Sequence, residues 1–154
     1  PSIAAYDIDL LYDTAVLAPA AVVFGDPVNG NQLDLFGLGL NAAGGSVPAP
    51  GVLDFFEVSL DFPSDLNAFQ LDAFTLAQVT FNTVGLGSSE ISFGDVILSD
   101  ANGADIADFT ADSASVTVVP APQTLALLAV GLLGLRQLRS ARQRATSETS
   151  VSTL

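Results

Sequence analysis

The side chains able to do chemistry in this 154-residue chain are almost all carboxylates. The chain carries 17 Asp and Glu against 4 Arg, has no Lys, His or Cys, and has a net charge of −13. These missing residue types exclude Ser-His-Asp triads, cysteine nucleophiles, Schiff bases and His/Cys zinc sites. A polyanion also repels phosphates, so we expect no nucleic-acid partner. Carboxylate chemistry, oxygen-ligated metals and non-covalent binding remain.

One loop groups oxygen side chains at a spacing suited to a hard cation. Asp100, Asn102 and Asp105 surround an Asn-Gly turn, and Asp108 and Asp112 follow closely. Calcium prefers six to eight oxygen ligands. We therefore name Asp100, Asn102 and Asp105 as candidate calcium ligands, and calcium as the only candidate cofactor. The alternative is an Asn-Gly hairpin turn with solvated flanks.

The carboxylates do not indicate a hydrolase. A glycosidase needs two facing carboxyl groups, one with a raised pKa, and no motif singles out such a pair. The chain has no Trp to stack on a sugar, and Tyr6 and Tyr12 fall on the apolar phase of their segment, which predicts core positions. We predict no enzymatic activity, while glycan binding through calcium or polar loops stays open.

The elements that must position these groups are predicted to be β-strands. Period-two alternation marks residues 6–12, with Asp7, Asp9 and Asp13 on the solvent face, and residues 56–62, with Glu57, Ser59 and Asp61 on the solvent face. The apolar phase changes at Gly94-Asp95, which predicts a β-bulge. The other predicted strands are residues 15–24, 32–40, 74–84, 91–98 and 116–118.

Turn residues separate these segments. The predicted turns are Asn29-Gly30, Gly44-Gly45, Gly85-Leu86-Gly87 and Asn102-Gly103. A short helix is predicted over residues 64–70, with Ser64 as its cap and Asp65 in its first turn. Many short strands separated by turns favour an all-β sandwich over residues 1–119, with a barrel as the alternative.

Composition changes sharply after this body. Residues 120–123 predict a stiff Pro-rich hinge, and the nearly all-apolar run TLALLAVGLLGL follows at 124–135. Every cation of the chain lies beyond that run, as expected for the cytoplasmic flank of a membrane span. We predict a short transmembrane helix over residues 124–138 and a basic, then Ser/Thr-rich, cytoplasmic tail over residues 139–154.

Two sets of residues carry this membrane prediction. One helical face would hold Leu125, Leu128, Leu132 and Leu135, and the orientation would be fixed by Arg136, Arg139, Arg142 and Arg144. The alternative is a soluble or amphipathic helix, because the four Leu also form an apolar stripe.

The order of Pro-x-Pro, short apolar run and Arg cluster resembles the PEP-CTERM sorting signal of exosortase systems in Gram-negative bacteria. The resemblance implies export, anchoring in the inner membrane with the C-terminus in the cytoplasm, cleavage by an exosortase-type protease, and release to the envelope or extracellular matrix. Ala121 stands where that family has Glu, so the sequence predicts anchoring and leaves cleavage open. The implied sorting motif is Val119, Pro120, Ala121 and Pro122.

Within the body, residues 5–17, 74–81, 91–106 and 115–118 resemble, in order, strands of a cohesin domain. The resemblance implies a nine-stranded jelly-roll sandwich, related in fold to some carbohydrate-binding modules, in a family whose best-known members bind dockerins. The family's first strand, which precedes Ala5, has no counterpart. We expect either a truncated sequence or an exposed sheet edge that a strand from another chain fills.

Together these features predict an exported surface or matrix protein with a non-catalytic protein-interaction module. Two alternatives are a polysaccharide-binding matrix protein and a structural subunit completed by a donated strand. The expected partners are an exosortase-type protease, the membrane through the C-terminal helix, and an unidentified surface protein or exopolysaccharide.

Overall fold

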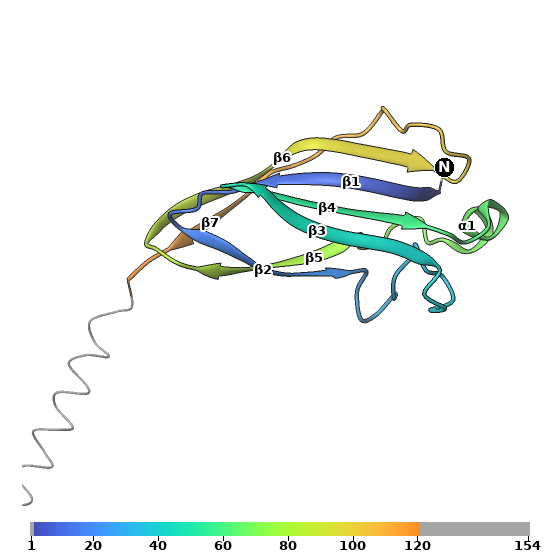
Figure 1. The fold of residues 1–154 in the computed structure, drawn as a ribbon, viewed down its shortest axis with the longest axis horizontal. Helices are drawn as coiled ribbons and strands as arrows, with labels where there is room; N and C mark the ends of the chain where they lie inside the picture. The colour runs from blue at the N-terminus through green and yellow to red at the C-terminus, as the bar shows by residue number, and fades with distance from the viewer. Residues whose placement is uncertain (1, 121–154) are drawn as a thin grey trace, which may run out of the picture. The chain divides into compact units, whose positions relative to one another are not determined.

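The structure is a computed structural model that describes residues 2–120 (Figure 1). The described residues form seven strands and one helix, which confirms the all-β prediction. In chain order these are β1 (Ile3–Leu11), β2 (Leu17–Phe24), β3 (Asn41–Ala49), β4 (Val52–Ser59), α1 (Pro63–Phe69), β5 (Ala77–Thr83), β6 (Gly87–Asp100) and β7 (Ala114–Val118).

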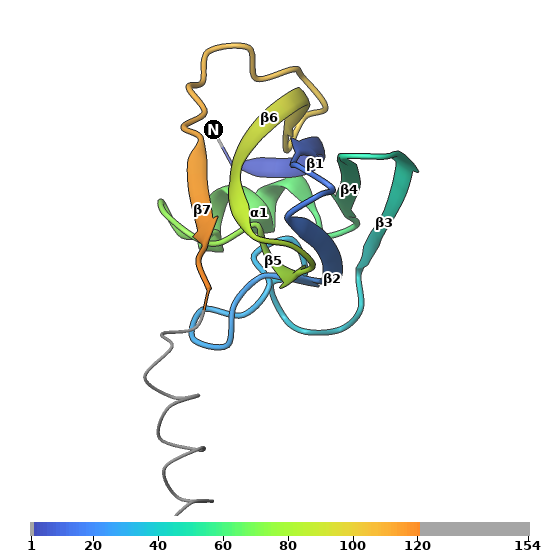
Figure 2. The same ribbon diagram turned by 90° about the vertical axis from the view of Figure 1, so that its left-hand side faces the viewer.

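The strands form two antiparallel sheets of unequal width. The larger sheet has the order β3-β4-β1-β6-β7, and the smaller sheet consists of β2 and β5. Figure 2 looks along the molecule and shows β2 and β5 lying below the larger sheet. The molecule is thus a sandwich, as predicted, and not the alternative barrel.

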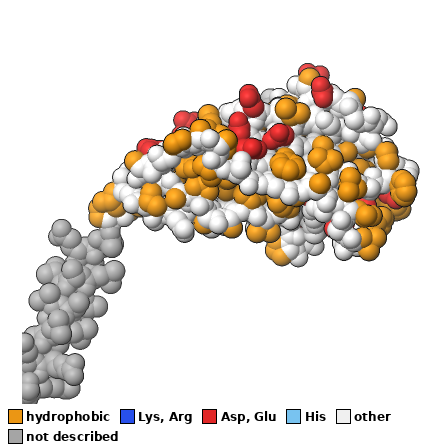
Figure 3. All heavy atoms as spheres, in the orientation of Figure 1, with side chains coloured by type: hydrophobic (Ala, Val, Ile, Leu, Met, Phe, Trp, Pro, Cys, Tyr) orange, Lys and Arg blue, Asp and Glu red, His pale blue; other side chains and the backbone are white. Residues whose placement is uncertain are grey.

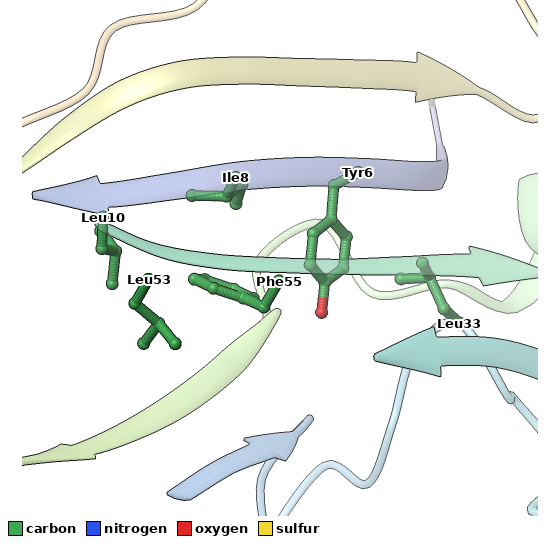
Figure 4. Close-up of a cluster of buried hydrophobic side chains, with 6 residues drawn as sticks. All are labelled: Tyr6, Ile8, Leu10, Leu33, Leu53 and Phe55. Atoms are coloured by element: carbon green, nitrogen blue, oxygen red, sulfur yellow. The ribbon is translucent and has the colours of Figure 1, made fainter. Parts of the chain in front are cut away.

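The core lies between the two sheets. Tyr6, Ile8 and Leu10 of β1 pack beside Leu53 and Phe55 of β4 and Leu33 (Figure 4). All are buried, and each fully buried large side chain contributes roughly 1.5–3 kcal/mol. The alternation predicted for β1 is confirmed. Tyr12 also packs against this cluster, with its ring centroid 5.3 Å from that of Phe81.

The predicted orientation of β4 is wrong. Leu53, Phe55 and Glu57 face the core, whereas Phe56 and Val58 lie outside, 40% and 39% exposed. The strand ends at Ser59, so the apolar residues at 60 and 62 that supported the opposite phase are not part of it. The inward phase is fixed by pairing, because Phe55 lies opposite Ile8 of β1.

Two other segments also differ from prediction. Residues 32–40 form successive turns instead of a strand, because the Asp34 carboxylate accepts the backbone N–H groups of residues 38, 39 and 40 at 2.9–3.2 Å. Conversely, the predicted turn Gly44-Gly45 lies inside β3. There the lack of a side chain makes room for the Phe56 ring, since a Cβ on Gly44 would lie 3.0 Å from Phe56 Cε1.

The predicted bulge and the predicted short helix are both present in the structure. β1 residues Ile8 and Leu10 pair with Val96 and Phe93, which leaves one extra residue on β6 and confirms the bulge at Gly94-Asp95. The helix is confirmed with Asp65 in its first turn, but the predicted Ser64 cap is wrong. Phe62 occupies the cap position without a side-chain hydrogen bond, and Pro63 starts the helix.

The C-terminal predictions fall mostly outside the described residues. Val119 is 71% exposed after β7, and Pro120 is the last described residue. Ala121 and Pro122, the predicted span at 124–138 with its Leu and Arg residues, and the tail at 139–154 all lie beyond it. Within residues 2–120 no helix is long and apolar enough to cross a membrane.

A buried carboxylate points from β4 of the larger sheet into the core. Glu57 is 0% exposed and accepts hydrogen bonds from the Tyr6 hydroxyl (3.0 Å) and from the side-chain amides of Asn41 (2.6 Å) and Asn31. Burial, and then the adjacent Glu57 charge, raise the pKa of Tyr6 far above its usual range, so its hydroxyl stays a donor. All the partners of Glu57 are donors, which suits a carboxylate and no other side chain of this size.

We predict that Glu57→Gln destabilises the fold by about 2–3 kcal/mol, because the new amide group would face donors and leave buried groups unpaired. Urea unfolding followed by circular dichroism measures the change. Glu90→Gln is the matched control, since Glu90 is exposed on β6 and should change stability by less than about 0.5 kcal/mol. Equal effects of the two substitutions would contradict the role assigned to Glu57.

Candidate functional site: the outer face of the larger sheet

The outer face of the larger sheet carries apolar side chains where water would be expected. Val58 of β4 lies opposite Ala5 of β1, and both Phe56 of β4 and Ile97 of β6 lie opposite Asp7. Phe56, Val58 and Ile97 are 40%, 39% and 56% exposed. They border a shallow depression of about 150 Å³. We call Ala5, Phe56, Val58 and Ile97 the outer patch.

Carboxylates lie within and beside the outer patch, on β1 and β4. Asp9 lies opposite Asp54, and Asp7 is two pairs further along the ladder, at the next position on the same face. Partial burial, the Asp54 charge, hydrogen bonding with Asp54 and the Asp9 charge together raise the pKa of Asp7. Residues 2–120 contain no Lys or Arg to offset these charges. Figure 3 shows one side of the molecule, on which hydrophobic and acidic side chains are interspersed without a basic one.

The structure therefore changes the acidic group expected from sequence. Asp7 and Asp9 are brought together with Asp54 of the neighbouring strand, while Asp13 lies beyond the end of β1. The Asp13 carboxylate instead accepts the Ala15 N–H at 2.8 Å in the turn after β1. Among the described residues no group of three or more acidic side chains is placed to hold a metal ion.

The candidate calcium loop follows β6. The Asp100 carboxylate accepts the backbone N–H groups of Ala104 (2.9 Å) and Asn102 (2.8 Å), and Gly103 has φ +78°. These hydrogen bonds, led by that from Ala104, lower the pKa of Asp100. Asp105 makes a backbone bridge to Ser99. Asp100 thus closes a turn, and calcium binding by Asp100, Asn102 and Asp105 stays a prediction.

Sequence reasoning did not name the outer patch. It assigned Phe56 and Val58 to the core, and it did not consider Ile97. A signal was nevertheless present, because Phe55-Phe56 and residues 96–98 are runs of adjacent apolar residues within strands. Since neighbouring side chains point to opposite faces, such runs place an apolar residue on each face.

The fold is similar to that of solved type II cohesins. A type II cohesin dyad from the adaptor ScaA scaffoldin of Acetivibrio cellulolyticus is 19% identical, with a TM-score of 0.60 over 77% of this chain and 40% of the dyad. A type II cohesin domain from the cellulosome of the same organism is 19% identical, with a TM-score of 0.59 over 75% of this chain and 78% of that domain.

A type II cohesin–X-dockerin complex from the same organism is also similar, at 14% identity and a TM-score of 0.55 over 70% of this chain and 75% of that one. No protein family and no curated protein matches the sequence. At these identities the similarity establishes the cohesin fold, and function must be argued from this chain's own residues.

We predict that Asp7→Asn raises stability at pH 7 by about 0.5 kcal/mol, because it removes a charge held beside like charges. Because the pKa of Asp7 is raised in the folded state, stability is greatest below the ordinary pKa of 3.8, where Asp7 is protonated in both states. Stability falls as the pH rises through the raised value, because the folded protein must then hold the charge beside like charges. The gain should therefore vanish near pH 3. Thermal unfolding across pH measures it.

Asp54→Asn provides the internal control, since it relieves the same repulsion. The double variant should gain less than the sum of the two single variants. An Asp7→Asn effect that is independent of pH, or that lowers stability at pH 7, would contradict the repulsion.

Proposed function

We propose that this chain is a non-catalytic protein-interaction module whose partner binds the outer patch. The observation that carries the proposal is the registered group of Phe56 and Val58 on β4 and Ile97 on β6, the two strands that flank β1. Single exposed apolar residues are common on protein surfaces, but contiguous ones on a rigid sheet are typical of binding sites. The strands hold the patch in place, so little conformational entropy is lost on binding.

The charges around the outer patch define the partner's chemistry. Asp7 lies between Phe56 and Ile97, Asp9 and Asp54 lie beside the patch, and the chain carries a net charge of −13. A complementary surface has apolar side chains at its centre and Lys or Arg at its rim. The similar cohesin–X-dockerin complex makes a dockerin-like domain the first partner to test. A glycan partner has less support, because Phe56 is the single aromatic ring in the outer patch.

Export and sorting belong to the same proposal. The order of Val119, Pro120, Ala121 and Pro122, the apolar run at 124–135 and the four Arg supports delivery by an exosortase-type system. The protein would first be held in the inner membrane and then reach the envelope or extracellular matrix of a Gram-negative bacterium. The exposure of Val119 after the last strand suits access by a protease.

We predict that Ile97→Lys weakens partner binding by roughly 30-fold or more, as expected when a central interface residue is replaced by an unpaired charge. Val23→Lys is the matched control, because Val23 is also 56% exposed but lies on β2 of the other sheet. Calorimetric titration of the full chain with a panel of purified dockerin modules measures both effects.

The outcomes separate the candidate functions. Equal binding by Ile97→Lys and the unmodified chain would reject the outer patch as the interface. Saturable binding to a glycan array, with no binding to any dockerin module, would favour the polysaccharide alternative.

We also predict that protein recovered from the envelope of its own cells ends near Pro120, because cleavage at the sorting motif removes the apolar run. Mass spectrometry of the native C-terminus measures this. Recovery of the intact chain ending at Leu154 from the cytosol alone would contradict export.

A further inference from the structure

Large apolar side chains gather at the end of the body where α1 lies. Figure 3 shows hydrophobic side chains at the end where Figure 1 places α1. They come from three segments, namely the turns at 34–40, the chain between β4 and α1, and α1 itself. The five most exposed are each 53–75% exposed, and we call them the tip patch: Phe36, Leu38, Leu60, Phe62 and Phe69.

The tip patch is held in one arrangement by contacts between these segments. The Phe36 ring packs edge-on against the Phe69 ring, with 6.2 Å between the ring centroids. The Leu35 N–H donates to the Asp61 carboxylate at 2.9 Å, which ties the turns at 34–40 to the chain between β4 and α1. Because the segments are fixed before any partner arrives, little conformational entropy is lost when the patch is covered.

The tip patch carries no exposed charge, although the chain is a polyanion. Residues 34–40 and 60–69 contain three carboxylates, and none of the three is exposed. Asp34 accepts three backbone N–H groups of its own turn, Asp61 is buried, and Asp65 is half-buried in the first turn of α1. Such a surface offers a charged partner nothing to pair with, whereas a second polyanion can approach it at little electrostatic cost.

The area of the tip patch fits one half of a specific interface. Three Phe and two Leu at these exposed fractions present about 600 Å² to solvent. Monomeric proteins rarely expose a contiguous apolar surface larger than this. Two such patches placed face to face would bury about 1,200 Å² in total, which is the lower limit of the usual range for specific protein–protein interfaces.

We propose that the tip patch is the interface of a symmetric dimer, and that its occupant is the tip patch of a second copy of this chain. Both halves are apolar and uncharged, so the surface is complementary to itself, and an isologous contact closes after two copies. Contact at the tips also keeps the carboxylates on the sheet faces of the two copies apart. The tip patch shares no residue with the outer patch, so either proposal can fail alone.

Phe62→Asp tests the dimer without threatening the fold. Phe62 occupies the N-cap of α1 without a side-chain hydrogen bond, and Asp is a favoured residue at that position, so the variant should fold. The symmetry places the new charge in the interface twice. We expect the dissociation constant of the dimer to rise roughly 100-fold or more. Sedimentation equilibrium of the full chain in a density-matched nonionic detergent measures this constant.

Leu86→Asp is the matched control. Leu86 is 64% exposed, as the tip-patch residues are, but it lies between β5 and β6, which meet at the opposite end of the body from α1 (Figure 1). The dissociation constant should change by less than about twofold in this variant. Any association through the apolar run at 124–135 is common to both variants and the unmodified chain, so the comparison isolates the tip patch.

Two further readouts use the unmodified full chain. Salt screens the repulsion between copies of like charge, so the dissociation constant should fall several-fold between about 0.01 and 0.15 M ionic strength. Amide hydrogen exchange in α1 should slow as the protein concentration rises through the dissociation constant, while exchange in β2 stays unchanged.

Four results would overturn the proposal. A full chain that stays monomeric, or equal dissociation constants for Phe62→Asp and Leu86→Asp, would show that the tip patch is not a dimer interface. A dissociation constant that rises with salt would show that charge pairing holds the dimer. Slower α1 exchange in the monomeric full chain on addition of phosphatidylcholine vesicles would assign the tip patch to a lipid surface.

Discussion

Glu57 is buried where a carboxylate is tolerated only if its oxygens accept hydrogen bonds, and Tyr6, Asn31 and Asn41 supply them. Because side chains alternate along a strand, Glu57 pointing inward makes Phe56 and Val58 point outward. The apolar outer patch is thus a consequence of a polar contact inside the sandwich. The same network ties the segment around residue 31 and the start of β3 to β4, so the positions of loop, strand and patch depend on one side chain.

The sequence predicted an element correctly where its residues fitted only one pattern, and it failed where they fitted two. β1 alternates without ambiguity, and the bulge at Gly94-Asp95 is a phase change that no other pattern explains, so both were predicted correctly. β4 contains Phe55-Phe56, so either phase was plausible until pairing with β1 selected one. The turns at 32–40 depend on Asp34 hydrogen bonds, which an apolar alternation at the same positions concealed.

The candidate site was predictable only in its charge. Acidic residues near β1 were apparent, but the neighbour that completes the group, Asp54, comes from another strand and requires the register. Gly44 was interpreted as a turn residue, whereas it makes room for the Phe56 ring across the sheet. Such roles arise between strands distant in sequence, and spacing along a single chain does not contain them. The resemblance to cohesins predicted a nine-stranded sandwich; residues 2–120 form a sandwich of seven strands, and the similarity to solved cohesins establishes the cohesin fold.

Within residues 2–120, β5 pairs with β2 alone, so one edge of this uncharged strand has no partner among the described residues. An unblocked strand is normally a starting point for stacking into fibrils. Here every copy carries a charge of −13, so copies repel one another before such edges can meet. That repulsion is long-ranged in dilute buffer and is screened beyond about 8 Å at physiological ionic strength. We therefore expect copies of the molecule to disperse less well as the ionic strength rises.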